Sequence, residues 1–255
     1  MTKNFNIWFK NFHAGIVLKV DVLIPTKDPS KIRPRLLQVL KGSDWVGEII
    51  IETSKPLSRA RVIGARKCST EWIAMFDDDV EIPENWFDSI LPFIQLKDIL
   101  AISTPSIDVN NVHMIAYKRV MDHFRPLEQR DAPFIDNTLI KREVLLNYNP
   151  SPLFYSEDEL LYRYIKKHGK WIHPPSCGVK HFLVMKDLVK AAIIMEQLGF
   201  YPLYKFLRSR VAYFTISILA IGYSHTYKTM TFFWKSNIKL MAGFLKARVN
   251  KKGII

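Results

Sequence analysis

The chain has only two cysteines, Cys68 and Cys177, among its 255 residues. Their spacing matches neither a zinc site nor a disulfide framework, and so low a cysteine content is typical of a reducing compartment. The N-terminal residues, MTKNFNIWFKNFH, also lack the continuous apolar core of a secretory signal peptide. The sequence therefore predicts an intracellular protein without a disulfide scaffold.

Long apolar runs are scarce as well. The longest uncharged stretch in the C-terminal part, Val211 to Tyr227, has 17 residues. A membrane-spanning helix needs about 20 apolar residues, with about 17 as the lower limit. A single span would also leave the lysines from Lys228 to Lys252 on the far side from a cytoplasmic domain, against the positive-inside tendency. A single span at 211–227 is therefore marginal.

Acidic residues are nearly absent from the C-terminal part. Residues 183–255 contain 12 Lys and Arg but only two acids, and they hold most of the net charge of +13. Trp234, Ile238, Met241 and Leu245 recur at helical spacing beside lysines, a pattern typical of a basic amphipathic helix on anionic lipid. The alternative is a helical subdomain packed on the rest of the protein with solvated lysines. An aromatic stripe in residues 1–15 predicts a further amphipathic helix, either at lipid or docked on the core.

Glycine-rich phosphate loops of the P-loop and dinucleotide-binding types are also absent. The most informative stretch is acidic instead: the apolar run Trp72 to Phe76 leads directly into Asp77, Asp78 and Asp79. Such a run predicts a buried strand, and ligands of open α/β sheets bind at the carboxyl ends of strands. Adjacent carboxylates repel one another unless a cation offsets their charge, and Mg²⁺ prefers carboxylate and phosphate oxygens. A metal site is favoured over a solvated acidic turn.

Strand and helix patterns alternate along residues 16–182, which predicts an α/β domain with a mostly parallel sheet. The predicted strands are 16–25, 48–52, 72–76, 99–105, 112–118 and 133–141. The predicted helices are 34–42, 57–69, 83–96, one from Arg142, and 156–169. Residues 183–255 form the predicted helical appendage.

A second group of acids, Glu157, Asp158 and Glu159, begins the predicted helix 156–169. Carboxylates in a first helical turn are stabilised by the helix dipole, which alone explains two of them. A carboxylate on a rigid, core-packed helix can also act as a general base.

Taken in order, these segments resemble glycosyltransferase family 2, the inverting enzymes of the GT-A fold. The first strand ends in Pro25-Thr26, the second ends in Glu52 where the family usually has Asp, and Asp77 with Asp79 resembles the D-x-D motif. The family's A-R-N-x-x-G helix is similar to Ala60, Arg61 and Gly64, without the Asn. Glu157-Asp158 resembles the E-D pair that carries the catalytic base, with Gly169 at the family's spacing, although the usual Arg falls one position early, at Arg163. The Q-x-x-R-W motif of processive synthases is missing, which implies one sugar per acceptor.

The resemblance implies a role for each matching residue. Asp158 is the expected base, with Glu157 as the alternative. Nucleotide-sugar contacts are expected from Pro25, Thr26, Glu52, Arg61, Asp77 and Asp78, and Mg²⁺ or Mn²⁺ ligands from Asp79, Asp77 and His181.

The expected reaction is transfer from a nucleotide-diphosphate sugar, by analogy GDP-mannose, to a lipid-linked acceptor (a polyprenyl or dolichyl phosphate or oligosaccharide) at the cytoplasmic membrane face, as in N-glycan assembly. Two other interpretations remain. A nucleic-acid-binding protein would use the basic tail, although the tail has no recognisable nucleic-acid motif. A sugar-nucleotide-binding module without catalysis is the other, and the intact acids argue against it.

Overall fold

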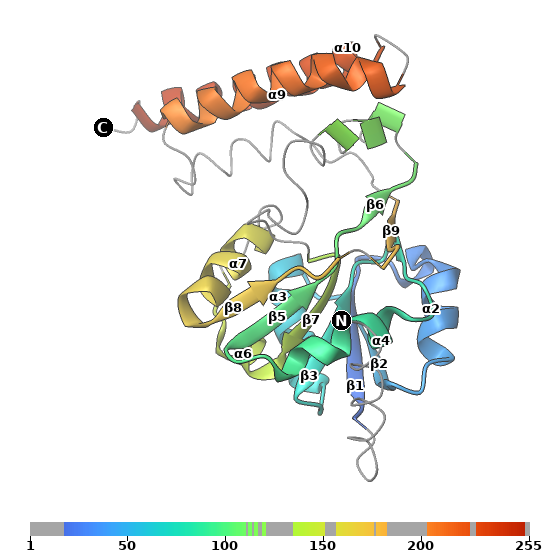
Figure 1. The fold of residues 1–255 in the computed structure, drawn as a ribbon. Coiled ribbons are helices and arrows are strands. Elements are labelled where there is room, and N and C mark those ends of the chain that lie inside the picture. Colours follow the sequence, from blue (N-terminus) through green and yellow to red (C-terminus); the bar gives the residue numbers. More distant parts are fainter. Residues whose placement is uncertain are drawn as a thin grey trace. The chain divides into compact units, whose positions relative to one another are not determined.

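The computed structural model describes residues 18–110, 112–113, 115–116, 119–120, 135–150, 157–175, 177–182, 203–224 and 228–252. The chain divides into two compact units (Figure 1). The first is formed by residues up to 106 together with 132–181, and the second by 107–131 together with 182–255. The second unit thus contains residues 107–131 in addition to the predicted appendage. The helix predicted in residues 1–15 lies outside the described residues.

The first unit is built on a six-stranded sheet with the strand order β2-β1-β3-β7-β5-β8. Strand β1 pairs in parallel with β2 and β3, and β5 pairs in parallel with β8, whereas β7 is antiparallel to both β3 and β5. The predicted α/β class with a mostly parallel sheet is therefore confirmed. The strands are β1 (Val20–Pro25), β2 (Val46–Glu52), β3 (Trp72–Phe76), β5 (Ile99–Ser103), β7 (Asn137–Lys141) and β8 (Lys170–Ile172).

Each face of this sheet carries its own apolar core, because successive side chains of a strand point to opposite faces. Trp72, Ala74 and Phe76 of β3 belong to one core, and Ile73 and Met75 belong to the other. The first core is completed by α2 (Pro34–Lys41) and α4 (Trp86–Ile90), and the second by α3 (Leu57–Lys67), α6 (Arg142–Asn147) and α7 (Glu157–His168). Burial on both faces explains why β3 is an uninterrupted apolar run.

Helix α3 approaches the sheet closely at Gly64. A β-carbon at this position would lie 2.2 Å from Cδ1 of Leu23 on β1, which is far inside van der Waals contact. Glycine therefore lets α3 pack against β1, and this packing fixes the position of Arg61 one turn earlier.

Two predicted elements differ in the structure. The helix predicted for 83–96 is divided into α4 and the 3₁₀ helix η2 (Leu91–Gln95), because Pro92 cannot continue an α-helical hydrogen-bond pattern. The strand predicted for 112–118 is wrong: residues 112–113, 115–116 and 119–120 are helical. Ala116 and Val120, four residues apart, share a face that packs on Ala220. Strand β6 is shorter and lies earlier, at Ile107–Asp108.

The second unit contains two long helices that pack against each other, α9 (Leu203–Ser224) and α10 (Lys228–Lys252). A helical C-terminal appendage was predicted and is confirmed. Among the described residues, no helix combines the length and the apolar character that crossing a bilayer requires.

Candidate active site

The three acids lie at the carboxyl end of β3, the edge at which open α/β sheets bind ligands. The N–H of Asp77 donates a hydrogen bond to the carbonyl oxygen of Asp136, over 3.1 Å. Asp136 directly precedes β7, so the antiparallel β3–β7 pair continues into the acidic turn. This pairing fixes the backbone from which Asp77, Asp78 and Asp79 project.

Arg61 connects this turn to α7. Its side chain is 3% exposed, and its guanidinium lies 3.3 Å from Oδ1 of Asp77 and 3.1 Å from Oε1 of Glu157. Burial alone would lower the pKa of Arg61, but the charges of Asp77, Glu157 and Asp158 outweigh it and raise the pKa. The buried guanidinium of Arg61 thus holds the carboxyl end of β3 and the start of α7 close together.

The two acids that begin α7 have different surroundings. Glu157 is buried, and its carboxylate is bound by Arg61. Asp158 is half-buried, and its Oδ1 accepts a hydrogen bond of 2.9 Å from the N–H of Glu159. Because an ion-paired, buried carboxylate is poorly placed to take a proton from a substrate, the geometry favours Asp158 over Glu157 as a base.

Asp79 lies beside His181 on the other side of the acidic turn. Strand β4 (Val80–Glu81) pairs in antiparallel fashion with β9 (Lys180–His181), which aligns Val80 with His181. As a result, Nε2 of His181 lies 3.3 Å from Oδ1 of Asp79.

Asp79 supplies a carboxylate oxygen, the donor that Mg²⁺ and Mn²⁺ prefer, and His181 supplies an imidazole nitrogen, which transition-metal ions accept. No cluster of three or more metal-binding side chains occurs in the described part of the chain. Mg²⁺ is commonly held by one or two carboxylates together with substrate phosphates and water, so the Asp79 carboxylate fits such an ion.

The remaining predicted contacts gather at the ends of β1 and β2. Pro25 is the last residue of β1; the hydroxyl of the next residue, Thr26, donates a short hydrogen bond to Asp78. The N–H of Thr26 donates to the carbonyl oxygen of Glu52, and Nζ of Lys67 lies 2.7 Å from the Glu52 carboxylate. Burial would raise the pKa of Glu52, but hydrogen bonds from Lys67 and Ser54 lower it to about 2. Glu52 is therefore an anion at any physiological pH.

Sequence reasoning missed a polar pair next to Asp77. Asp136 and Asn137 are buried, and neither Oδ2 of Asp136 nor Nδ2 of Asn137 has a hydrogen-bond partner among the described residues. Nε of Arg61 also has no hydrogen-bond partner in the part of the chain that the structure describes. Buried polar groups in native proteins are nearly always paired, so such atoms beside a predicted site indicate groups that a ligand would satisfy. The only sequence signal was the interruption of the apolar run 133–141 by an acid and an amide.

The fold resembles those of several solved glycosyltransferases. A mannosyltransferase from Pyrobaculum calidifontis, solved with GDP-mannose and Mn²⁺, superimposes with a TM-score of 0.61 at 11% identity, over 97% of this chain and 94% of that one. Glucosyl-3-phosphoglycerate synthase from Mycobacterium tuberculosis, solved with Mn²⁺, UDP and phosphoglyceric acid, gives a TM-score of 0.52 at 12% identity, over 71% and 77% of the two chains. No curated protein matches the chain by sequence.

The family assignment comes from the sequence model of glycosyl transferase family 2, which matches residues 30–164. The match covers more than half of the 255 residues and includes the acidic turn after β3 as well as the start of α7. The chain belongs to glycosyl transferase family 2 and is a glycosyltransferase with the GT-A fold.

Proposed function

We propose that the protein is a metal-dependent inverting glycosyltransferase that moves one sugar from a nucleotide-diphosphate sugar to an acceptor. The observation that carries this proposal is the buried Arg61, which brings the acid after β3 and the acid at the start of α7 to one site. An inverting transfer needs donor-binding groups on one side of the reacting carbon and a base on the other.

Thr26, Glu52, Asp77 and Asp78 surround the ends of β1, β2 and β3, where the nucleoside and the diphosphate are expected. Asp79 and His181 would hold Mg²⁺ or Mn²⁺, and the solved neighbours from Pyrobaculum and Mycobacterium both contain Mn²⁺. The cation neutralises charge on the departing nucleotide.

Asp158 is the proposed base that takes the proton from the acceptor hydroxyl. The Asp158 side chain is only half-buried and remains accessible to an entering acceptor, whereas Glu157 forms an ion pair with Arg61. If the acceptor is a phosphate, it is already an anion, and Asp158 would mainly orient it.

The orphan atom of Asp136 beside Asp77 suits a sugar. A sugar hydroxyl can donate to Oδ2 of Asp136, whereas Asn137 is fully buried, with its Oδ1 accepting hydrogen bonds from Trp86 and Thr104. Leaving such a group as Oδ2 of Asp136 unpaired costs about 1–3 kcal/mol, which favours a bound ligand that pairs it.

The donor is proposed to be GDP-mannose and the acceptor to be lipid-linked, at the cytoplasmic face of a membrane. The GDP-mannose complex of the Pyrobaculum mannosyltransferase supports the donor by analogy. Support for lipid comes from α10, where Trp234, Ile238, Leu245 and Val249 are exposed and recur on one helical face. The exposed Lys228, Lys235, Lys239 and Lys246 follow the adjacent face, which is the charge pattern of a helix lying on anionic lipid.

Donor binding is testable by thermal unfolding with a panel of nucleotide sugars and Mn²⁺. At a donor concentration about 100 times Kd, binding adds about 2.7 kcal/mol to stability, and GDP-mannose is expected to give the largest rise in Tm. Asp79→Ala is expected to lose the Mn²⁺-dependent part of that rise. Asp44→Ala removes an exposed aspartate from a loop between α2 and β2 and serves as the matched control. An undiminished Mn²⁺-dependent rise in Asp79→Ala would remove Asp79 from the metal site.

Membrane contact is testable by flotation with vesicles of neutral lipid alone and of neutral lipid with anionic lipid. Wild-type protein is expected to float with the anionic vesicles and to be released by salt, because exposed charges are screened. Ile238→Glu is expected to abolish flotation, whereas Leu96→Glu, at an exposed apolar residue of the first unit, leaves it intact. Retention on DNA in place of flotation would favour the nucleic-acid interpretation.

A further inference from the structure

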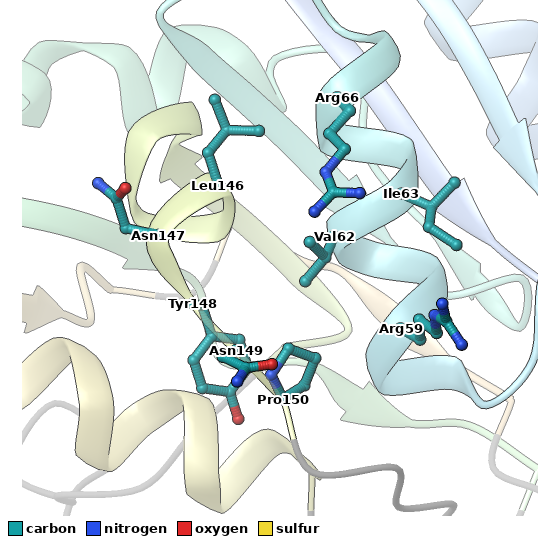
Figure 2. A pocket seen from close by; sticks show the side chains of 9 residues that line it. All are labelled: Arg59, Val62, Ile63, Arg66, Leu146, Asn147, Tyr148, Asn149 and Pro150. Atoms are coloured by element: carbon teal, nitrogen blue, oxygen red, sulfur yellow. The ribbon is translucent and has the colours of Figure 1, made fainter.

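A cavity lies in the first unit between α3 and the end of α6. It has a volume of about 540 Å³, within the range of small-molecule pockets. Figure 2 shows its two walls, α3 on one side and the end of α6 with the following loop on the other. The lining residues are Arg59, Val62, Ile63, Arg66, Leu146, Asn147, Tyr148, Asn149 and Pro150.

The described residues that line the cavity give it a positive charge. Arg59 and Arg66 both line it, and none of the described residues that line it carries a carboxylate. Neither guanidinium forms a hydrogen bond or an ion pair within the described residues. Burial raises the pKa of the Tyr148 hydroxyl to about 12, with Glu157 adding to the shift and Arg61 opposing it, so this group remains a donor at neutral pH.

The two arginines of the cavity are turned away from the candidate active site, whereas Tyr148 lies close enough to Arg61 and Glu157 for their charges to affect its pKa. Arg61 is two residues from Arg59 and five from Arg66, and with 3.6 residues per turn these separations place it on the opposite side of α3. The helix therefore presents one arginine to the acids of the active site and two to the cavity. Arg59 and Arg66 are seven residues apart, about 10 Å along the axis, and in Figure 2 their guanidinium groups point in different directions, so binding one anion requires these long side chains to turn toward it.

We propose that this cavity is a second anion site, which binds a small organic phosphate through Arg59 and Arg66. Guanidinium groups bind phosphate oxygens in a bidentate manner, and unpaired arginines pay no cost of breaking an existing ion pair. Val62 and Leu146 supply an apolar surface beside the arginines, and Asn147 and Asn149 supply amides that suit hydroxyl groups. Every ligand of this site is proposed to carry a phosphate. The organic part of the ligand determines whether it contacts the apolar surface or the amides.

The test is calorimetric titration of the full chain at low salt in EDTA with inorganic phosphate, glycerol 3-phosphate and phenyl phosphate. Saturable binding with one site is expected. Because charge-assisted hydrogen bonds are stronger than neutral ones, Arg59→Gln with Arg66→Gln should weaken binding about tenfold or more. Tighter binding of phenyl phosphate would indicate that the organic part of the ligand packs on the apolar surface of Val62 and Leu146. Tighter binding of glycerol 3-phosphate would indicate that its hydroxyl groups bind the amides of Asn147 and Asn149.

The matched control is Arg35→Gln with Lys41→Gln, which removes the same charge from exposed positions on α2. This pair is expected to change affinity about twofold or less, as screened distant charges do. Both double variants alter exposed helical residues, so folding is preserved. Equal weakening by the two double variants, or the absence of saturable binding for all probes, would overturn the proposal. The titrations contain neither donor nor divalent metal, so their outcome is independent of the transfer reaction.

Discussion

Replacing Asp158 by asparagine is expected to lower kcat about 100- to 10,000-fold, the usual contribution of a general base. Asparagine keeps the size of the side chain and can still accept the hydrogen bond from Glu159, but it cannot take a proton. Donor binding should be unchanged, because the base lies on the acceptor side of the reacting carbon. The measurement is release of nucleoside diphosphate from the donor identified by thermal unfolding, with kcat and KM determined separately.

Glu157→Gln is the control for this prediction. Because Glu157 is bound to Arg61, its loss is expected to lower stability while kcat falls much less than in Asp158→Asn. The opposite order, with Glu157→Gln the more damaging variant for kcat, would make Glu157 the base. A kcat of Asp158→Asn within about twofold of wild type would instead indicate an acceptor that is already ionised.

The strands and helices that carry the predicted site could be predicted from the sequence, because burial on both faces of the sheet makes a strand an uninterrupted apolar run. Residues 72–76 of β3 were predicted with the bounds that the structure shows, since an apolar run ends abruptly at three charged residues. Helix α2 was equally readable, from the proline at its start and the glycine after its end. The strand predicted for 112–118 failed because Val112 and Ile115 favour strands locally. The helix is stabilised by contact with Ala220 of α9, about a hundred residues away in the sequence.

The arrangement within the site was harder to predict, because it too depends on contacts between residues that are far apart in the sequence. The D-x-D and E-D motifs named the acids, but the choice between Glu157 and Asp158 depends on Arg61, which is 96 residues from Glu157 in the chain. The unpaired atoms of Asp136 and Asn137 are a property of packing, and no pattern of residue types reports whether a buried amide has a partner. Sequence motifs therefore locate the chemistry, whereas long-range contacts decide which group is available for it.

Replacing Arg61 by methionine is expected to destabilise the protein by about 3–5 kcal/mol, because removing one partner of a buried ion pair leaves uncompensated charge. Methionine fills much of the volume but leaves the carboxylates of Asp77 and Glu157 facing each other without the cation between them. Transfer activity should fall as well, since the same contact joins the two halves of the site. Chemical denaturation gives the change in the free energy of unfolding.

A double-mutant cycle with Glu157→Gln separates charge from packing in this prediction. Removing one of the two carboxylates relieves their repulsion, so Arg61→Met with Glu157→Gln is expected to be more stable than Arg61→Met alone, with a coupling of about 1–3 kcal/mol. Arg35→Met, at an exposed arginine of α2, is the control and should change stability by about 0.5 kcal/mol or less. If Arg61→Met matched that control, Arg61 would not be the group that holds α7 to the end of β3. The carboxylates would then need another cation to lie together, and the metal ion proposed at Asp79 would be the nearest candidate.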